Sequence, residues 1–194
     1  MMKLLSQGLL TLSLLHPLVA VAADWELIEE KDGIKIYKRQ ETDSALISFA
    51  GECVVDAKPA TIAAVLNDHK RKGEWMANLM EARLIEEFNG MSSIVYSSFK
   101  SPGFISNRDF IYKYDFKVDP KTHAVNLTVL STEHTQAPAT VGVRGQLNYS
   151  VYVMEPMPDG KTRFRGEINV DPKGWLPAWL VNLTQKKLLL TGIF

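Results

Sequence analysis

The sequence has few of the residues from which catalytic and metal-binding sites are built. It contains one cysteine, Cys53, and four histidines scattered along 194 residues. None of the patterns H-E-x-x-H, C-x-x-C and G-x-S-x-G occurs, so the chain encodes neither a familiar zinc site nor a nucleophile elbow. A single cysteine cannot form an internal disulfide, so the hydrophobic core must hold the fold. We expect no metal and no cofactor, and an unreactive Cys53.

An excess of positive charge is also lacking. Lysine and arginine number 22, and so do aspartate and glutamate. Because nucleic acids are held mainly by clustered basic residues, we expect no nucleic-acid partner. The charged run from Asp68 to Lys72 (DHKRK) is interpreted as a solvated corner of the surface.

The first residues lack the uninterrupted apolar run of roughly 20 residues that a membrane-spanning helix needs. The segment from Leu4 to Leu15 is apolar but is broken by several polar residues. Lys3 precedes it, and the small residues of Ala20-Val21-Ala22-Ala23 follow it. One positive charge, a short apolar segment and an A-x-A pattern are typical of a secretory signal peptide. We predict a signal peptide over residues 1–23, a domain over 24–194, and a periplasmic or secreted protein.

The middle of the chain alternates between apolar and polar residues, which indicates β-strands. The clearest case puts Phe110, Tyr112, Tyr114 and Phe116 on one face of a single strand. The pair Asn89-Gly90 predicts a tight hairpin. Further strands are predicted over residues 34–39, 45–55, 83–88, 92–99, 125–131, 146–154 and 162–170.

Helices are predicted at three places besides a short helical turn at residues 24–28. Two short helices follow the early strands, one starting near Pro59 and one running from Gly73 to near Leu79. A long terminal helix is expected from about Leu176 towards Thr191, after the turn at residues 171–174. The order predicts an α+β fold in which a curved antiparallel sheet wraps around the long C-terminal helix, with space between them.

The chain resembles START domains, the lipid-transfer branch of the helix-grip (Bet v 1-like) superfamily, and looks like an exported bacterial-type member. The resemblance spans nearly all of residues 24–194. It rests on segments that occur in the family's order: Asp32-Gly33-Ile34 with Tyr37, Asp68 with Trp75, Ser106-Asn107-Arg108-Asp109-Phe110, Val143-Arg144, and Asp171-Pro172-Lys173-Gly174-Trp175-Leu176-Pro177 with Val181-Asn182.

This resemblance implies a tunnel between the sheet and the last helix that holds one lipid, such as a sterol, phospholipid or sphingolipid. The loop at residues 133–142 and the last helix would form its gate. A pocket of this kind is mostly apolar with a few polar groups. The residues expected to face the ligand are Phe110, Tyr112, Tyr114, Phe116, Tyr149, Val151, Phe164, Ile168, Leu180 and Leu183.

Arg108 and Asp109 are adjacent on a strand, so they must point to opposite faces. We interpret them, with Trp75 and Arg144, as residues that support the structure. Some sterol-binding members of the family carry a buried arginine six residues after the position of Arg108, where this chain has Tyr114. This departure argues against a sterol held by such an ionic contact.

The main hypothesis is therefore a non-enzymatic carrier of a lipid or other hydrophobic ligand, acting as a monomer that contacts membranes transiently. Trp175, Trp179, Lys186 and Lys187 are the expected membrane contacts or gate residues, because aromatic and basic residues favour the membrane interface. Two alternatives stay open. One is a cyclase-like enzyme on the same fold, since catalytic groups can be assembled from distant residues. The other is a partner-binding module with a filled core.

Overall fold

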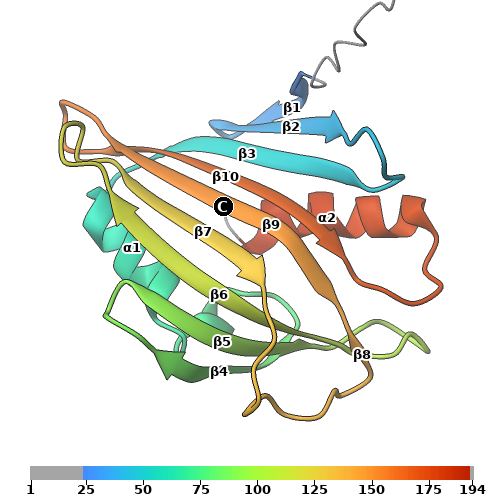
Figure 1. Ribbon diagram of the computed structural model, residues 1–194. Coiled ribbons are helices and arrows are strands. Elements are labelled where there is room, and N and C mark those ends of the chain that lie inside the picture. Colours follow the sequence, from blue (N-terminus) through green and yellow to red (C-terminus); the bar gives the residue numbers. More distant parts are fainter. Residues whose placement is uncertain (1–23, 193–194) are drawn as a thin grey trace, which may run out of the picture.

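A curved antiparallel sheet forms most of the molecule (Figure 1). The computed structural model describes residues 24–192 and the side chains of residues 24–186, so the predicted signal peptide and the side chain of Lys187 lie outside the described residues. The strand order is β1-β2-β3-β10-β9-β7-β6-β5-β4, and β8 pairs with β6 in parallel. The strands are β1 (Glu26–Lys31), β2 (Ile34–Gln40), β3 (Ile47–Val55), β4 (Leu79–Glu87), β5 (Ser92–Phe99), β6 (Arg108–Val118), β7 (Val125–Ser131), β8 (Val143–Arg144), β9 (Gln146–Pro156) and β10 (Thr162–Asp171).

The predicted strands are present, and the predicted hairpin at Asn89-Gly90 joins β4 to β5. Gly90 adopts a positive φ of 59°, which glycine tolerates best. The helical turn expected at residues 24–28 is wrong, because this segment runs into β1, which pairs with β2 at the edge of the sheet. Three of the six residues of β1 are glutamates, and such charges protect an edge strand from pairing with other chains.

The helices are shorter than expected. Within residues 24–192 there are two α-helices, α1 (Pro59–Asn67) and α2 (Ala178–Gly192). The second short helix expected after the early strands is wrong: only the single 3₁₀ turn η1 (Lys72–Glu74) forms there. Gly73 favours helix weakly, and Asn78 takes a left-handed φ of 61° that ends helical winding before β4. The terminal helix begins at Ala178 and not at Leu176.

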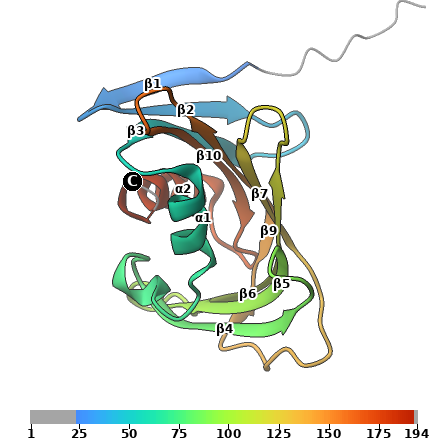
Figure 2. The ribbon, with the colours of Figure 1, turned by 90° about the vertical axis from the view of Figure 1, so that its left-hand side faces the viewer.

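Both helices lie on the concave side of the sheet (Figure 2). Helix α1 contacts β7 and β9, and α2 contacts β3 and β10. Asn182 on α2 accepts a hydrogen bond from the backbone N–H of Ile47 (2.9 Å), and Lys186 forms an ion pair with Glu29 of β1 (2.8 Å). These contacts fix α2 across the end of the sheet that contains β1, β2, β3 and β10.

The main core lies on the same concave side. The predicted aromatic row is confirmed on β6: the rings of Tyr112 and Tyr114 are 5.7 Å apart, and those of Tyr114 and Phe116 are 6.4 Å apart. They pack with Leu127 and Val129 of the neighbouring strand β7. Alternate residues of β6 point to the convex side, where Ile111 packs in a smaller cluster.

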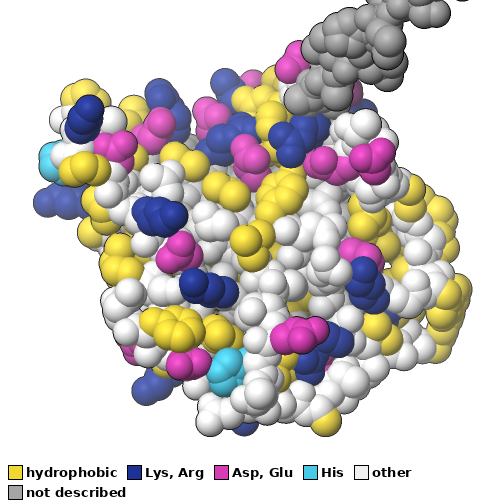
Figure 3. Space-filling model, in the orientation of Figure 1, with side chains coloured by type: hydrophobic (Ala, Val, Ile, Leu, Met, Phe, Trp, Pro, Cys, Tyr) yellow, Lys and Arg dark blue, Asp and Glu magenta, His cyan; other side chains and the backbone are white. Residues whose placement is uncertain are grey.

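The convex face in the view of Figure 3 carries lysine, arginine and acidic side chains interspersed with one another, in keeping with the balanced charge of the chain. Over the described residues, no helix is long and apolar enough to cross a membrane.

Candidate functional site

A cavity of about 280 Å³ lies between the concave face of the sheet and α2. Strands β6, β7, β9 and β10 supply one wall, and α2 with the preceding loop supplies the other. The segments 76–78 and 99–105 complete the lining. The lining residues are Met76, Ala77, Asn78, Phe99, Lys100, Ser101, Pro102, Ile105, Arg108, Phe110, Tyr112, Tyr114, Val129, Leu147, Ser150, Tyr152, Ile168, Val170, Pro172, Leu176, Leu180, Val181, Thr184 and Gln185.

The structure brings five of the ten expected ligand-facing residues together in this lining. They come from three elements: Phe110, Tyr112 and Tyr114 from β6, Ile168 from β10, and Leu180 from α2. Their contact with a ligand stays a prediction.

The expected inward orientation of Tyr149 and Val151 is wrong. The pairing of β9 with β10 shifts by one residue, so that Asn169 faces Tyr149 whereas Val170 faces Leu147. The extra residue, Asn148, is a β-bulge, and a bulge changes which side chains face each side of a sheet. Leu147 therefore lines the cavity, and after the bulge Ser150 and Tyr152 do so in place of Tyr149 and Val151.

Three further expected residues do not belong to the lining. Phe116 and Phe164 point to the concave side but are buried in the core, and Phe164 stacks on Tyr152 with ring centroids 6.0 Å apart. Leu183 on α2 is exposed to solvent. The alternation of apolar residues shows which side chains point to the concave side of the sheet. It does not distinguish those that pack in the core from those that line the cavity.

Buried polar groups gather at Tyr114, one of the lining residues. Lys72 is completely buried, its ammonium group contacts the Tyr114 hydroxyl, and Nζ lies 4.1 Å from the centre of the tyrosine ring. No described carboxylate pairs with Lys72. Burial lowers the pKa of Lys72 to about 7 and raises that of Tyr114. Because the charged form of a buried amine is disfavoured, Lys72 is close to losing its proton at neutral pH.

His69 packs edge-on against Tyr114, with ring centroids 5.1 Å apart. Neither ring nitrogen has a hydrogen-bond partner among the described residues. Burial, and secondarily the charge of Lys72, lower the pKa of His69 to about 4. The interpretation of the run from Asp68 to Lys72 as a solvated corner is therefore wrong for His69 and Lys72, which are buried. Asp68 and Arg71 do form a surface ion pair (2.6 Å).

Arg108 and Asp109 point to opposite faces, as their adjacency requires. Arg108 lines the cavity and donates hydrogen bonds to the carbonyl oxygens of Pro172 and Lys173, both 3.3 Å. Asp109 is completely buried on the convex side, where it forms an ion pair with Arg144 and accepts a hydrogen bond from Val141 N–H (2.8 Å). Arg108 thus ties the start of β6 to the loop before α2.

Trp75, the other residue expected to support the structure, is half-buried beside η1.

The loop at residues 133–142 lies on the convex face and not at the cavity. His134 pairs with Glu86 (2.9 Å), Ala137 packs against the convex-side cluster, and Arg144 donates to Pro138 O (2.8 Å). Within the described chain none of its residues lines the cavity. The expectation that this loop forms part of the gate is therefore wrong, because the loop lies away from the cavity.

The segments that border the cavity, including the start of α2, carry exposed aromatic side chains. Phe104 is 90% exposed, and its neighbours Pro102 and Ile105 line the cavity. Trp175 and Trp179 are 78% and 68% exposed, and each directly precedes a lining leucine. Arg108, which follows the first of these segments in the chain, is linked by its hydrogen bonds to Pro172 and Lys173, just before the second. Of the two expected lysines, Lys186 is paired with Glu29 and Lys187 lies outside the described side chains.

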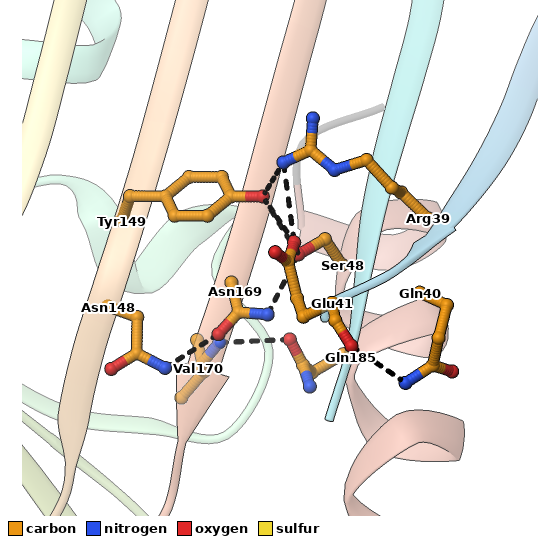
Figure 4. Close-up of polar contacts among 9 residues, drawn as sticks. All are labelled: Arg39, Gln40, Glu41, Ser48, Asn148, Tyr149, Asn169, Val170 and Gln185. Carbon is orange, nitrogen blue, oxygen red and sulfur yellow. Dashed lines mark hydrogen bonds and ion pairs between the residues drawn. The ribbon is translucent and has the colours of Figure 1, made fainter. Parts of the chain in front are cut away.

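Tyr149 takes part in a polar network on the convex side of the sheet (Figure 4). Its hydroxyl lies 2.7 Å from Arg39 Nη2 and 2.8 Å from Ser48 Oγ. Glu41 pairs with the same arginine (3.3 Å) and accepts a hydrogen bond from Ser48. No sequence pattern indicates this network, because Tyr149 lies more than 100 residues further along the chain than the other three members.

Over the described residues, no group of three or more histidine, cysteine, aspartate or glutamate side chains is placed to hold a metal ion. Cys53 is half-buried, and burial raises the pKa of its thiol. A thiol with a raised pKa is a poor nucleophile.

Comparison with known proteins identifies the family. A model of the START domain matches residues 13–193. The chain belongs to the START domain family. This START domain is 29% identical over 170 residues to mouse phosphatidylcholine transfer protein, a match that covers 84% of this chain and 78% of the mouse protein. It is 22% identical over 184 residues to the ceramide transfer protein of Xenopus laevis, covering 85% of this chain and 30% of that protein.

The fold is that of solved START structures. The crystal structure of a STAR-related lipid transfer protein from Xanthomonas axonopodis matches with a TM-score of 0.77 and 23% sequence identity, over 87% of this chain and 94% of that chain. This likeness confirms the architecture of a curved antiparallel sheet with helices on its concave side.

Proposed function

We propose that the protein binds one lipid molecule in the cavity between the sheet and α2 and transfers it between membranes. The observation that carries this proposal is the cavity itself, which has a mostly apolar wall and lies in a chain of the START family. The cavity also argues against the alternative of a module with a filled core.

The relatives support a lipid as the ligand. One is named for the transfer of phosphatidylcholine and another for the transfer of ceramide. Exposing a lipid chain to water costs about 0.8 kcal/mol per CH₂ group. A cavity lined by residues such as Ile168, Leu180 and Val129 removes this cost while the lipid crosses water.

In this proposal α2 and the segment at residues 99–105 open at a membrane. Phe104, Trp175 and Trp179 are exposed beside the lining, and aromatic side chains favour the membrane interface. We expect these three residues to enter the interface, so that the lipid leaves without crossing water. This contact would be transient, because the aromatic patch is small and Lys186 is occupied by Glu29.

The protein acts as a monomeric, non-enzymatic carrier in this account. Lys72 and Tyr114, the buried titratable pair beside the cavity, are bonded to each other, and among the described residues no group of side chains is placed to hold a metal ion. Its place of action is an exported compartment, supported by the signal-peptide pattern of residues 1–23.

A transfer assay tests the proposal. Donor vesicles carry a fluorescent phospholipid or ceramide with a quencher, acceptor vesicles carry neither, and the rise in fluorescence reports movement of the lipid. We expect the protein to accelerate transfer in proportion to its concentration. A rate equal to that without protein, for phosphatidylcholine, phosphatidylethanolamine, phosphatidylglycerol and ceramide alike, would contradict the proposed transfer.

A further inference from the structure

Helix α2 completes the hydrogen bonding of two strands where their ladder ends. The last paired residues of β3 and β10 are Phe49 and Ile168, so backbone groups beyond them need other partners. Asn182 accepts from Ile47 N–H of β3 (2.9 Å), and Gln185 Oε1 accepts from Val170 N–H of β10 (3.0 Å). The two amides are three residues apart on the helix, so they lie on one face.

The two amides differ in what their NH₂ groups do. Asn182 Nδ2 donates to Ala45 O (3.3 Å), so both ends of that amide are used. Gln185 is only 2% exposed, and its Nε2 has no partner among the described residues. The assignment of its two ends is chemically fixed, because Val170 N–H is a donor and only the oxygen can accept from it. Figure 4 shows Gln185 turned with its oxygen towards Val170.

The unpaired NH₂ group belongs to a side chain in the cavity wall. Gln185 lines the cavity together with Leu180, Val181 and Thr184 of α2 and Val170 of β10. The hydroxyl of Thr184 already donates to Leu180 O (2.9 Å). A buried donor without a partner costs about 1–3 kcal/mol, and a ligand that brings an acceptor removes that cost.

We infer that Gln185 Nε2 donates a hydrogen bond to an acyl carbonyl oxygen of the bound lipid. A carbonyl is an acceptor with no proton of its own. An ether oxygen also lacks a proton but is a weaker acceptor than a carbonyl oxygen, and a hydroxyl would bring a proton that needs an acceptor of its own. The ligand class is therefore acyl lipids, with an ester or amide carbonyl, and not ether lipids or hydrocarbons. This inference rests on the proposed lipid binding.

The test compares ester and ether forms of the same lipids. Purified protein is equilibrated with vesicles that contain phosphatidylcholine, phosphatidylethanolamine and phosphatidylglycerol, each as diacyl and dialkyl-ether molecules of equal chain length and amount. Native mass spectrometry then gives the ratio of the two forms bound. One hydrogen bond predicts a diacyl preference of about threefold to tenfold for the wild-type protein.

Gln185→Leu should bring this ratio close to one while lipid remains bound. Gln185→Glu, which keeps an oxygen for Val170 N–H, should lower the ratio as well at a pH where the carboxylate is ionised. Asn182→Leu is the matched control, because Asn182 caps a strand on the same helix but does not line the cavity, and it should leave the ratio unchanged. Because both lipids compete for the same folded molecules, the ratio does not depend on how much of a variant is folded.

The outcomes separate the two proposals. A wild-type ratio of one, or an unchanged preference in Gln185→Leu, would overturn the role of Gln185 while leaving lipid binding intact. Absence of both lipid forms from the wild-type protein would contradict the proposed function, and the role of Gln185 would fall with it.

Discussion

Lys72, buried beside the cavity-lining residue Tyr114, shows how one residue can work against stability. Its side chain is completely buried beside Tyr114, and burial lowers its pKa from 10.5 to about 7. Below pH 7 the amine is protonated in both the folded and unfolded states, so folding carries the full cost of burying the charge. Between pH 7 and 10.5 the unfolded state holds more protons, so stability rises with pH. Above 10.5 both states are neutral and the cost is absent.

Lys72→Met is therefore expected to stabilise the protein at pH 6, by up to about 5 kcal/mol on the scale of 1.4 kcal/mol per pH unit. This advantage over wild type should shrink between pH 7 and 10. The free energies of unfolding of both proteins, from urea titrations at several pH values, check the prediction. An advantage that is constant with pH would show that Lys72 is not a buried, poorly compensated charge.

Asp109 is a residue whose charge is compensated. It is completely buried and holds Arg144 and the backbone of Val141. Removing one partner of a buried ion pair costs about 3–5 kcal/mol. The cost of neutralising Asp109 falls below most of this range, because Arg144 is partly exposed and water can solvate its charge. We expect Asp109→Asn to lower the free energy of unfolding by about 2–3 kcal/mol.

Asp115→Asn is the control for this substitution, because Asp115 forms a surface pair with Lys117 on the same strand (3.8 Å). A surface pair contributes about 0–1 kcal/mol. If the two variants lost equal stability in urea unfolding, the buried pair would not hold β6, β8 and the loop at residues 133–142 together.

At the scale of elements, the exposed end of α2 and the segment at residues 99–105 carry the proposed membrane contact. Trp179→Ala should slow lipid transfer between vesicles severalfold while the amount of lipid bound stays the same, because the side chain points to solvent and not into the cavity. Phe104→Ser should act in the same direction.

Phe88→Ala is the matched control for these two variants. Phe88 is an exposed aromatic residue at the β4–β5 turn, at the opposite end of the sheet in Figure 1. Its loss should leave the transfer rate unchanged. Equal transfer by wild type and Trp179→Ala would remove α2 from the membrane contact.

The elements themselves could be predicted because each leaves a local pattern. The alternation along β6 placed the aromatic row correctly, and Asn89-Gly90 located a hairpin. The bulge at Asn148 leaves no such pattern, since the residues after it continue to alternate in the opposite phase. The expected orientation of Tyr149 and Val151 is wrong for this reason, whereas Ile168 and Leu180 line the cavity.

What could not be predicted depends on contacts between distant segments. The basic run ending at Lys72 looks like a surface, and only its packing under Tyr114 buries it. Gln185 has no local signal either, because its role arises from the end of the β3–β10 ladder. The surroundings of both residues therefore depend on how distant parts of the chain pack, which residue type alone does not reveal.

At the scale of the whole molecule, the curved sheet and α2 leave a cavity between them that a filled core would not leave. The most direct test is native mass spectrometry of the protein purified over residues 24–194, followed by solvent extraction and identification of what it carries. We predict one acyl lipid per chain, displaced when a bulky side chain fills the cavity, as in Ser150→Trp. A ligand-free mass, with no uptake from a total lipid extract, would contradict the proposed function.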